Sequence, residues 1–170
     1  MQILLILAGI LIGLVLIVTI AGLFFPEKHT GIIAREFKQS PEEIWTLITN
    51  RSKELSWRTD LKNMERLTDR NENEVWKEKT HRGQTLITVT TELVLNEKLV
   101  RKLVDHKWYG GTWIIELSKT ENGSKILFTE HGEIYNPLIR FMFNVVFSRT
   151  PTIVEYANQL SASLHSKVTN

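Results

Sequence analysis

The polar residues with the clearest potential for chemistry lie close together near the end of a β-like segment, in the run 129–133, Thr-Glu-His-Gly-Glu. Alternation along this strand puts Glu130 on the same face as Ile126 and Phe128, which is the apolar, inward face. A carboxyl group buried among apolar side chains has a raised pKa, which suits it to general acid or base catalysis. Glu130 is therefore the one candidate catalytic residue. The alternatives are pairing with a buried arginine, or a bulge near Gly132 that turns the side chain outward.

No other catalytic or cofactor motif stands out. The sequence has no glycine-rich phosphate loop, no GxSxG nucleophile motif and no HExxH zinc motif. The 5 histidines are scattered and there are 0 cysteines, so we expect neither a metal site nor a cofactor. The 21 basic and 19 acidic residues nearly balance, which argues against nucleic acid as a partner, because that partner requires a concentrated basic face. These observations favour a binding protein over an enzyme.

The first part of the chain is a long apolar run, since residues 3–25 carry no charged side chain. A helix over this run is about 35 Å long, enough to cross a hydrocarbon core of about 30 Å. A cleaved signal peptide has a basic start and a shorter apolar core, so residues 1–26 are predicted to be an uncleaved transmembrane anchor. Lys28, Arg35 and Lys38 follow the run. They predict a single-pass membrane protein whose C-terminal domain is cytoplasmic.

Two glycines in the apolar run have a spacing that matters for helix pairing. Gly9 and Gly13 form a GxxxG pattern, which lets two membrane helices approach closely. A homodimer through this face is one interpretation. The other is that glycine is simply common in membrane helices.

Residues 27–170 are long enough for one domain with its own core. The run Ser40-Pro41-Glu42-Glu43 predicts the start of a helix with a capping box, and a second short helix is expected over 53–58. Short connectors between the strands that follow predict an antiparallel meander. The expected strands are 32–38, 64–68, 74–80, 85–95, 98–107, 112–119 and 125–135.

Strand alternation then assigns faces to these segments. Trp113 and Phe128 are expected to point inward, whereas the faces of strand 98–107 are ambiguous. The basic residues of that stretch are expected to form a solvated strand face or to touch anionic lipid headgroups; they are Lys98, Arg101, Lys102 and Lys107. The residues of strand 85–95 expected to share one face are Ile87, Val89, Thr91, Leu93 and Leu95.

A long final helix is predicted from Asn136-Pro137 to about Leu164, with a kink or break near 149–150 caused by Pro151. Its first part is apolar nearly all round, so part of that surface should face a cavity, a loop or the bilayer. The residues concerned are Phe141, Met142, Phe143, Val146 and Phe147. Its later part is amphipathic, with one apolar face formed by Ile153, Ala157, Leu160 and Leu164.

Several segments together resemble the START-like superfamily, also called SRPBCC, and within it the polyketide cyclase/dehydrase and lipid-transport branch. These segments are FKQSPEEIWTLITN, LSWRTDLKNMERL, GTWIIELSKTENGSKILFTEHGEIYNP and the final helix. The resemblance covers nearly all of residues 32–165. It implies an α+β helix-grip fold, in which a curved, antiparallel, seven-stranded sheet wraps around a long C-terminal helix and encloses an apolar cavity. Members bind lipids, sterols, polyketides or plant hormones, and only some are enzymes.

The resemblance implies that residues 27–170 are a ligand-binding domain for an apolar small molecule or lipid, held at the membrane by residues 1–26. The alternatives are a cyclase/dehydrase-type enzyme that uses Glu130, and a non-catalytic membrane interaction protein. Large apolar side chains on inner faces are also ordinary core residues. The candidate ligand-contacting residues, with Phe141 and Val145 expected on the gripping helix, are Trp57, Trp76, Val89, Trp113, Phe128, Glu130, Phe141 and Val145.

Overall fold

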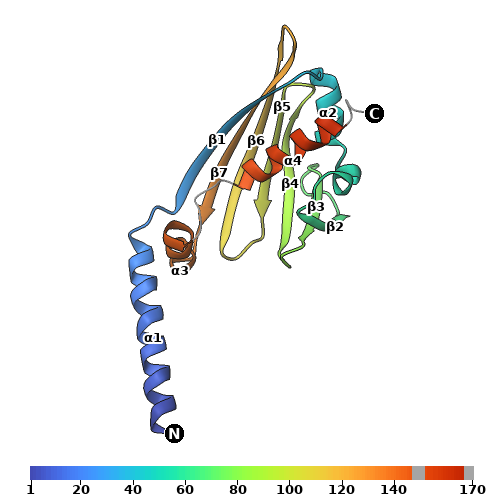
Figure 1. Ribbon diagram of the computed structural model, residues 1–170. Coiled ribbons are helices and arrows are strands. Elements are labelled where there is room, and N and C mark those ends of the chain that lie inside the picture. Colours follow the sequence, from blue (N-terminus) through green and yellow to red (C-terminus); the bar gives the residue numbers. More distant parts are fainter. Residues whose placement is uncertain (147–151, 167–170) are drawn as a thin grey trace.

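A computed structural model describes residues 1–146 and 152–166 of the chain. Its centre is one antiparallel sheet with the strand order β1-β7-β6-β5-β4-β3-β2. Figure 1 shows helix α4 (Thr152–Ser166) lying across one face of this sheet. The meander predicted from the short connectors is confirmed. The strands are β1 (Lys28–Phe37), β2 (Leu61–Arg66), β3 (Val75–Thr80), β4 (Thr85–Val94), β5 (Lys98–Val104), β6 (Tyr109–Thr120) and β7 (Gly123–Ile134).

The apolar N-terminal run forms helix α1 (Gln2–Leu23), which extends away from the sheet (Figure 1). Its apolar side chains are exposed along the helix, and by length and composition it could cross a membrane. Its C-terminal end contacts the short helix α3 (Pro137–Phe141). A Cβ atom at Gly22 would overlap the carbonyl group of Pro137, and the ring centroids of Phe25 and Phe141 are 6.1 Å apart.

The capping box predicted at Ser40 is present at the start of helix α2 (Pro41–Thr49). The Glu43 backbone N donates to Ser40 Oγ at 3.3 Å, and the Ser40 backbone N donates to Glu43 Oε2 at 3.0 Å. These two bonds satisfy donors that the first helical turn leaves unpaired. The second short helix is a 3₁₀ helix, η1 (Arg51–Ser56), and begins earlier than predicted.

Helix α4 carries the apolar face predicted for the end of the chain. Ile153, Ala157 and Leu160 are 0% exposed, and Leu164 is 2% exposed. Tyr156, which lies on the same side of α4 one turn after Ile153, is also buried. This face packs into one hydrophobic core with residues from α2 and the inner face of the sheet, among them Ile44, Ile48, Leu99, Ile115, Ile126 and Phe128.

The prediction of one long C-terminal helix is wrong at its beginning. Residues 137–146 form α3, which lies beside α1, and then a π-helical turn, η2 (Met142–Val146), so α4 alone grips the sheet. Phe141 and Val145 therefore do not lie on the gripping helix. The physical reason is that α3 has its own partner, because Phe141 packs on Phe25. The kink predicted near 149–150 and the side chains of Val146 and Phe147 lie outside what the structure describes.

The prediction that residues 87, 89, 91, 93 and 95 share a face is also wrong. The pairing of β4 with β5 shifts register between Thr90 and Glu92, and an extra residue in one strand reverses the alternation beyond it. Before the shift, Thr88 points inward and donates to Glu78 Oε1 at 2.7 Å. Val89 is buried on the opposite face, level with Val75.

Candidate functional site

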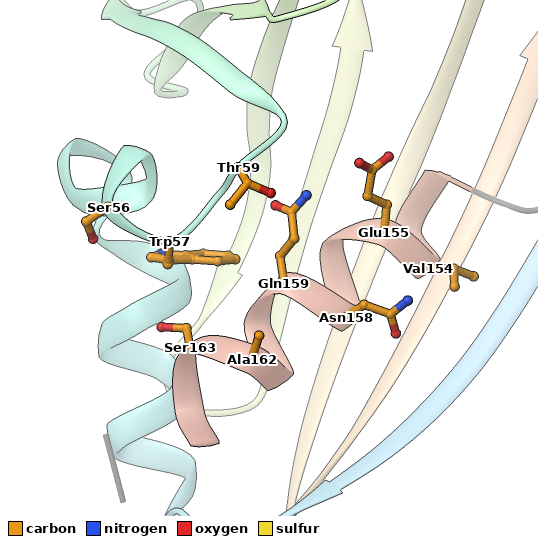
Figure 2. Close-up of a pocket in the computed structure, with 9 residues that line it drawn as sticks. All are labelled: Ser56, Trp57, Thr59, Val154, Glu155, Asn158, Gln159, Ala162 and Ser163. Carbon is orange, nitrogen blue, oxygen red and sulfur yellow. The ribbon is translucent and has the colours of Figure 1, made fainter. Parts of the chain in front are cut away.

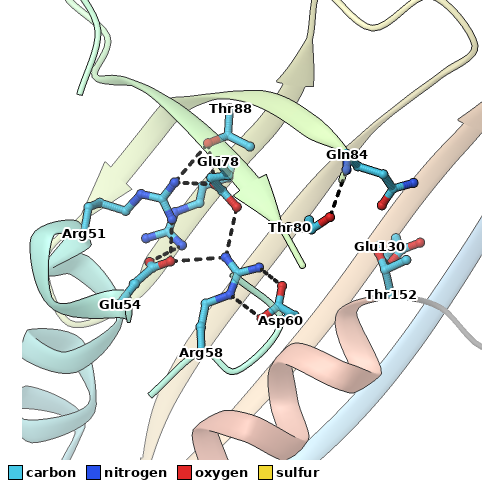
Figure 3. Close-up of polar contacts among 11 residues, drawn as sticks. Arg51, Glu54, Arg58, Asp60, Glu78, Thr80, Gln84, Thr88, Glu130 and Thr152 are labelled. Atoms are coloured by element: carbon cyan, nitrogen blue, oxygen red, sulfur yellow. Dashed lines mark hydrogen bonds and ion pairs between the residues drawn. The ribbon is translucent and has the colours of Figure 1, made fainter. Parts of the chain in front are cut away.

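Five buried charged side chains form an ionic cluster between η1, β3 and β5 (Figure 3). Arg51 Nη1 donates to Glu54 Oε2 at 2.6 Å. Arg58 Nη1 donates to Glu54 Oε2 at 3.2 Å and to Glu78 Oε2 at 3.1 Å. Arg51 also bonds to the other Glu78 oxygen. The fifth member, Arg101, places Nη1 2.7 Å from Glu54 Oε1.

Local structure explains why these charges meet. In η1 and the turn after it, Arg51, Glu54 and Arg58 are spaced three and four residues apart, so they lie on one side of the helix. In β3, alternation puts Glu78 on the same face as Trp76. We did not predict this cluster from the sequence. Two sequence patterns could have indicated it: the period-two alternation of β3, and the spacing of Arg51, Glu54 and Arg58 in and after η1.

The carboxylates of the cluster stay ionised because arginines surround them. Burial opposes ionisation of Glu78, but Arg51 and Arg58 outweigh it and lower the pKa of Glu78 to about 2. Burial likewise opposes ionisation of Glu54, and Arg101, Arg51 and Arg58 together still lower the pKa of that carboxyl below its usual value. The inner face of the domain therefore contains permanent charges as well as apolar side chains.

The prediction of a solvated basic strand face is wrong for Arg101. It is 5% exposed, and its Nη2 donates to the backbone oxygen of Ile48 at 2.6 Å. The register of β5 with β6 puts Arg101 opposite Trp113 and Leu99 opposite Ile115. This settles the ambiguous strand, since Leu99 and Arg101 point inward.

Glu130 lies on the inner face, as strand parity predicted, and is 5% exposed. Its partners differ from those expected. The Ile153 backbone N donates to Glu130 Oε2 at 2.7 Å, Thr152 Oγ1 donates at 2.9 Å and Trp113 Nε1 donates at 3.2 Å. The other oxygen lies 3.2 Å from His29 Nε2. The carboxylate thus caps the N-terminus of α4, where the helix dipole favours negative charge, and Figure 3 shows Glu130 next to Thr152.

An aromatic cluster lies between α4 and the sheet, with Tyr156 at its centre. The Tyr156 ring centroid is 5.3 Å from that of Trp57, 5.4 Å from that of Trp113 and 6.2 Å from that of Phe128. Burial raises the pKa of the Tyr156 hydroxyl to about 12. The predicted site residues Trp57, Trp113 and Phe128 therefore meet around Tyr156. The sequence analysis did not single out Tyr156, although it directly precedes Ala157, a residue of the predicted apolar face.

A groove of about 670 Å³ runs between α4 and the segment that follows η1 (Figure 2). The indole of Trp57 forms one wall, and Figure 2 shows Gln159 reaching from α4 toward Thr59. Trp57 Nε1 and Gln159 Oε1 are both buried without a hydrogen-bond partner among the described residues. The groove is lined by Ser56, Trp57, Thr59, Val154, Glu155, Asn158, Gln159, Ala162 and Ser163.

The other predicted site residues lie apart from this groove. Trp76 is buried with Arg51 Cζ 5.6 Å from its ring centroid. Val89 is on the opposite face of the sheet, Phe141 packs on Phe25, and Val145 is 57% exposed. Within residues 1–146 and 152–166, no group of three or more histidine or carboxylate side chains is placed to hold a metal ion.

No family model and no curated protein matches the sequence, but solved structures do. A START superfamily protein from Mycobacterium smegmatis matches with a TM-score of 0.61 and 12% identity over 83% of this chain and 99% of its own. Ara h 8.0201 matches with a TM-score of 0.63 and 11% identity over 84% and 99%. The di-domain ARO/CYC StfQ from the steffimycin biosynthetic pathway matches with a TM-score of 0.62 and 11% identity over 84% and 53%. Such low identity shows the fold alone, and that fold is the START-like, or SRPBCC, helix-grip fold.

Proposed function

We propose that the protein is a membrane-tethered binding module for an apolar small molecule or lipid. The fold of the domain supports ligand binding, and the exposed apolar surface of α1 supports the tether. The observation that carries the proposal is the groove beside Trp57. Trp57 is the one predicted ligand-contacting residue that lines this groove. Lys28 and Arg35 follow α1 and favour a cytoplasmic position for the domain.

The groove offers both kinds of contact that small-molecule sites use. The Trp57 ring supplies apolar area, whose burial provides most of the affinity for an apolar ligand. Polar side chains line the same groove, among them Thr59, Asn158 and Gln159, and side chains of these types can donate and accept hydrogen bonds. A ligand with a hydroxyl or carbonyl group would be oriented by bonds to such side chains.

Filling the groove should abolish ligand retention. The change Ala162→Trp places an indole on the groove side of α4, and we expect it to remove most of any co-purifying non-protein mass seen by native mass spectrometry of the detergent-extracted full chain. The matched control is Ala34→Trp, because Ala34 is exposed on β1, away from the groove. The control should keep the adduct. A folded wild-type protein that never carries an adduct would contradict the proposal.

The enzyme alternative depends on Glu130, and its geometry favours a structural role. Three donors already share Glu130 Oε2, and two of them belong to the first turn of α4. A carboxylate engaged in this way satisfies donors that the first helical turn leaves unpaired, and so stabilises the start of the helix. We therefore propose a binding protein without catalysis as the better interpretation.

The face of α1 that carries Gly9 and Gly13 is open, with no atom within 4 Å of a Cβ at either position. We expect a homodimer through this face, and the double change Gly9→Ile, Gly13→Ile should shift it to monomer because the helices could no longer approach closely. Analytical ultracentrifugation of the full chain in detergent measures this. The change Ala8→Ile adds bulk next to the face and should leave the dimer intact. The same molecular mass for wild type and double variant would exclude this interface.

A further inference from the structure

We infer that the end of the domain next to α1 is a lipid-facing surface that holds the domain in one orientation on the bilayer. This surface, the proximal patch, consists of Phe24, Trp108, Tyr135, Phe143 and Val145, all of which are exposed. The inference rests on the proposed membrane-spanning role of α1. It adds which side chains of the domain contact lipid.

Contacts with the last turn of α1 fix the level of α3 along that helix. Gly22 lies against the backbone of Pro137 so closely that a Cβ atom would overlap it. Phe25 packs edge-on against Phe141. Because about 20 apolar residues span the hydrocarbon core, Gly22 near the end of α1 lies at the boundary of that core. The helix α3 therefore lies at the same boundary.

Polar contacts make the joint between α1 and the domain specific. Arg140 Nη2 donates to Glu27 Oε2 at 2.9 Å, and Arg140 Nε donates to the backbone oxygen of Ile134 at 2.6 Å. The Ile134 backbone N donates to the backbone oxygen of Glu27 at 2.8 Å. Figure 1 shows α3 beside the end of α1 and crossing its direction. With these contacts formed, the same end of the domain always faces the bilayer.

The loop between β5 and β6 brings a tryptophan to this end. The backbone N of Tyr135 donates to the Trp108 backbone oxygen at 2.9 Å, which ties the loop to the start of α3. An indole at a membrane surface places its apolar ring toward lipid and its N–H toward water. Lys107 is exposed beside the patch, and its charge attracts anionic headgroups. Lys28 is also exposed there, but its Nζ lies 3.5 Å from Glu133 Oε1.

The apolar side chains of η2 complete the patch. Val145 is 57% exposed and Trp108 is 49% exposed, although the core of the domain lies between the sheet and α4. An exposed apolar surface that continues from an apolar helix, and that has Lys107 at its edge, fits the boundary between headgroups and acyl chains. This continuity is the reason to assign the patch to lipid.

Site-directed spin labelling of the full chain tests the inference, and the chain suits it because it has no natural cysteine. Labels at Trp108→Cys and Val145→Cys report on the patch, and a label at Leu95→Cys, in the hairpin at the other end of β5, is the control. The protein is reconstituted in vesicles of phosphatidylcholine and phosphatidylglycerol. Collision with oxygen, which concentrates in lipid, is compared with collision with a water-soluble nickel chelate.

We expect the labels at 108 and 145 to collide more with oxygen and less with the chelate than the label at 95. Chelate access at 108 and 145 equal to that at 95 would overturn the inference. Low access to both agents would also overturn it, because protein would then cover the patch. A label at Leu11→Cys, in the middle of α1, separates this failure from failure of the tether. Lipid-like behaviour at 11 with water-like behaviour at 108 and 145 would leave the tether standing, whereas water-like behaviour at 11 would remove both.

Discussion

The change Glu78→Gln should lower the free energy of unfolding of the domain by about 3–5 kcal/mol, which is the usual cost of breaking a buried ion pair by removing one partner. Glu78 is 3% exposed and bonds to both Arg51 and Arg58. A glutamine has nearly the same shape but no charge. The two guanidinium groups would then be buried with one anion fewer, and part of their desolvation cost would be uncompensated.

Urea unfolding of the full chain in detergent, followed by tryptophan fluorescence, measures this change. Lys77→Gln is the matched control, because Lys77 directly precedes Glu78 on β3 and forms its ion pair with Glu65 at the surface. Surface pairs of this kind contribute about 0–1 kcal/mol. Equal effects of the two changes would show that the cluster is hydrated and contributes little.

The same cluster predicts how the stability of the domain depends on pH. The pKa of Glu78 is about 2 in the folded protein and about 4.5 as the ordinary value. A carboxyl group with a depressed folded pKa contributes stability above its unfolded pKa, and this contribution is lost as the pH falls toward the folded pKa. Wild type should therefore lose more stability than the Glu78→Gln variant between about pH 4.5 and pH 2.

Local patterns predicted those parts of the fold that depend on neighbouring residues. The capping box at Ser40 needs only two residues and is present. Parity along β7 correctly put Glu130 and Phe128 on one face, because no register shift interrupts the pairing of β7 with β6. The apolar face of α4 follows a helical period, and Ile153 and Leu160 are buried as expected.

Predictions failed where distant segments decide the outcome. The register shift in β4 comes from its pairing with β5, so alternation alone placed Val89 on the wrong face. Arginine usually lies on the solvated face of a strand, but Arg101 is paired in the interior with Glu54 from η1. The apolar run after Asn136 packs on the end of α1 through Pro137 and on Phe25 through Phe141, rather than extending the gripping helix. The groove beside Trp57 depends on the position of α4 relative to η1, which no local pattern specifies.

The change Glu130→Ala should destabilise the domain by about 3 kcal/mol, because it removes a helix cap worth about 1 kcal/mol and leaves buried donors unpaired at about 1–3 kcal/mol each. The donors concerned include the Ile153 backbone N and Trp113 Nε1. Glu130→Gln should cost less, about 1 kcal/mol, since an amide oxygen can still accept from the start of α4.

Hydrogen exchange distinguishes this structural role of Glu130 from catalysis. In the Glu130→Ala variant, the amides of the first turns of α4 should exchange faster, whereas those of α2, which has its own cap at Ser40, should change less. The change Glu155→Ala is the control, because it removes an exposed carboxylate from the first turn of the same helix. Unchanged protection of α4 in the Glu130→Ala variant would mean that the carboxylate does not hold the helix. The buried carboxyl group of Glu130 would then lack a structural explanation, and an acid or base role, suggested by its position on the strand, would become the better one.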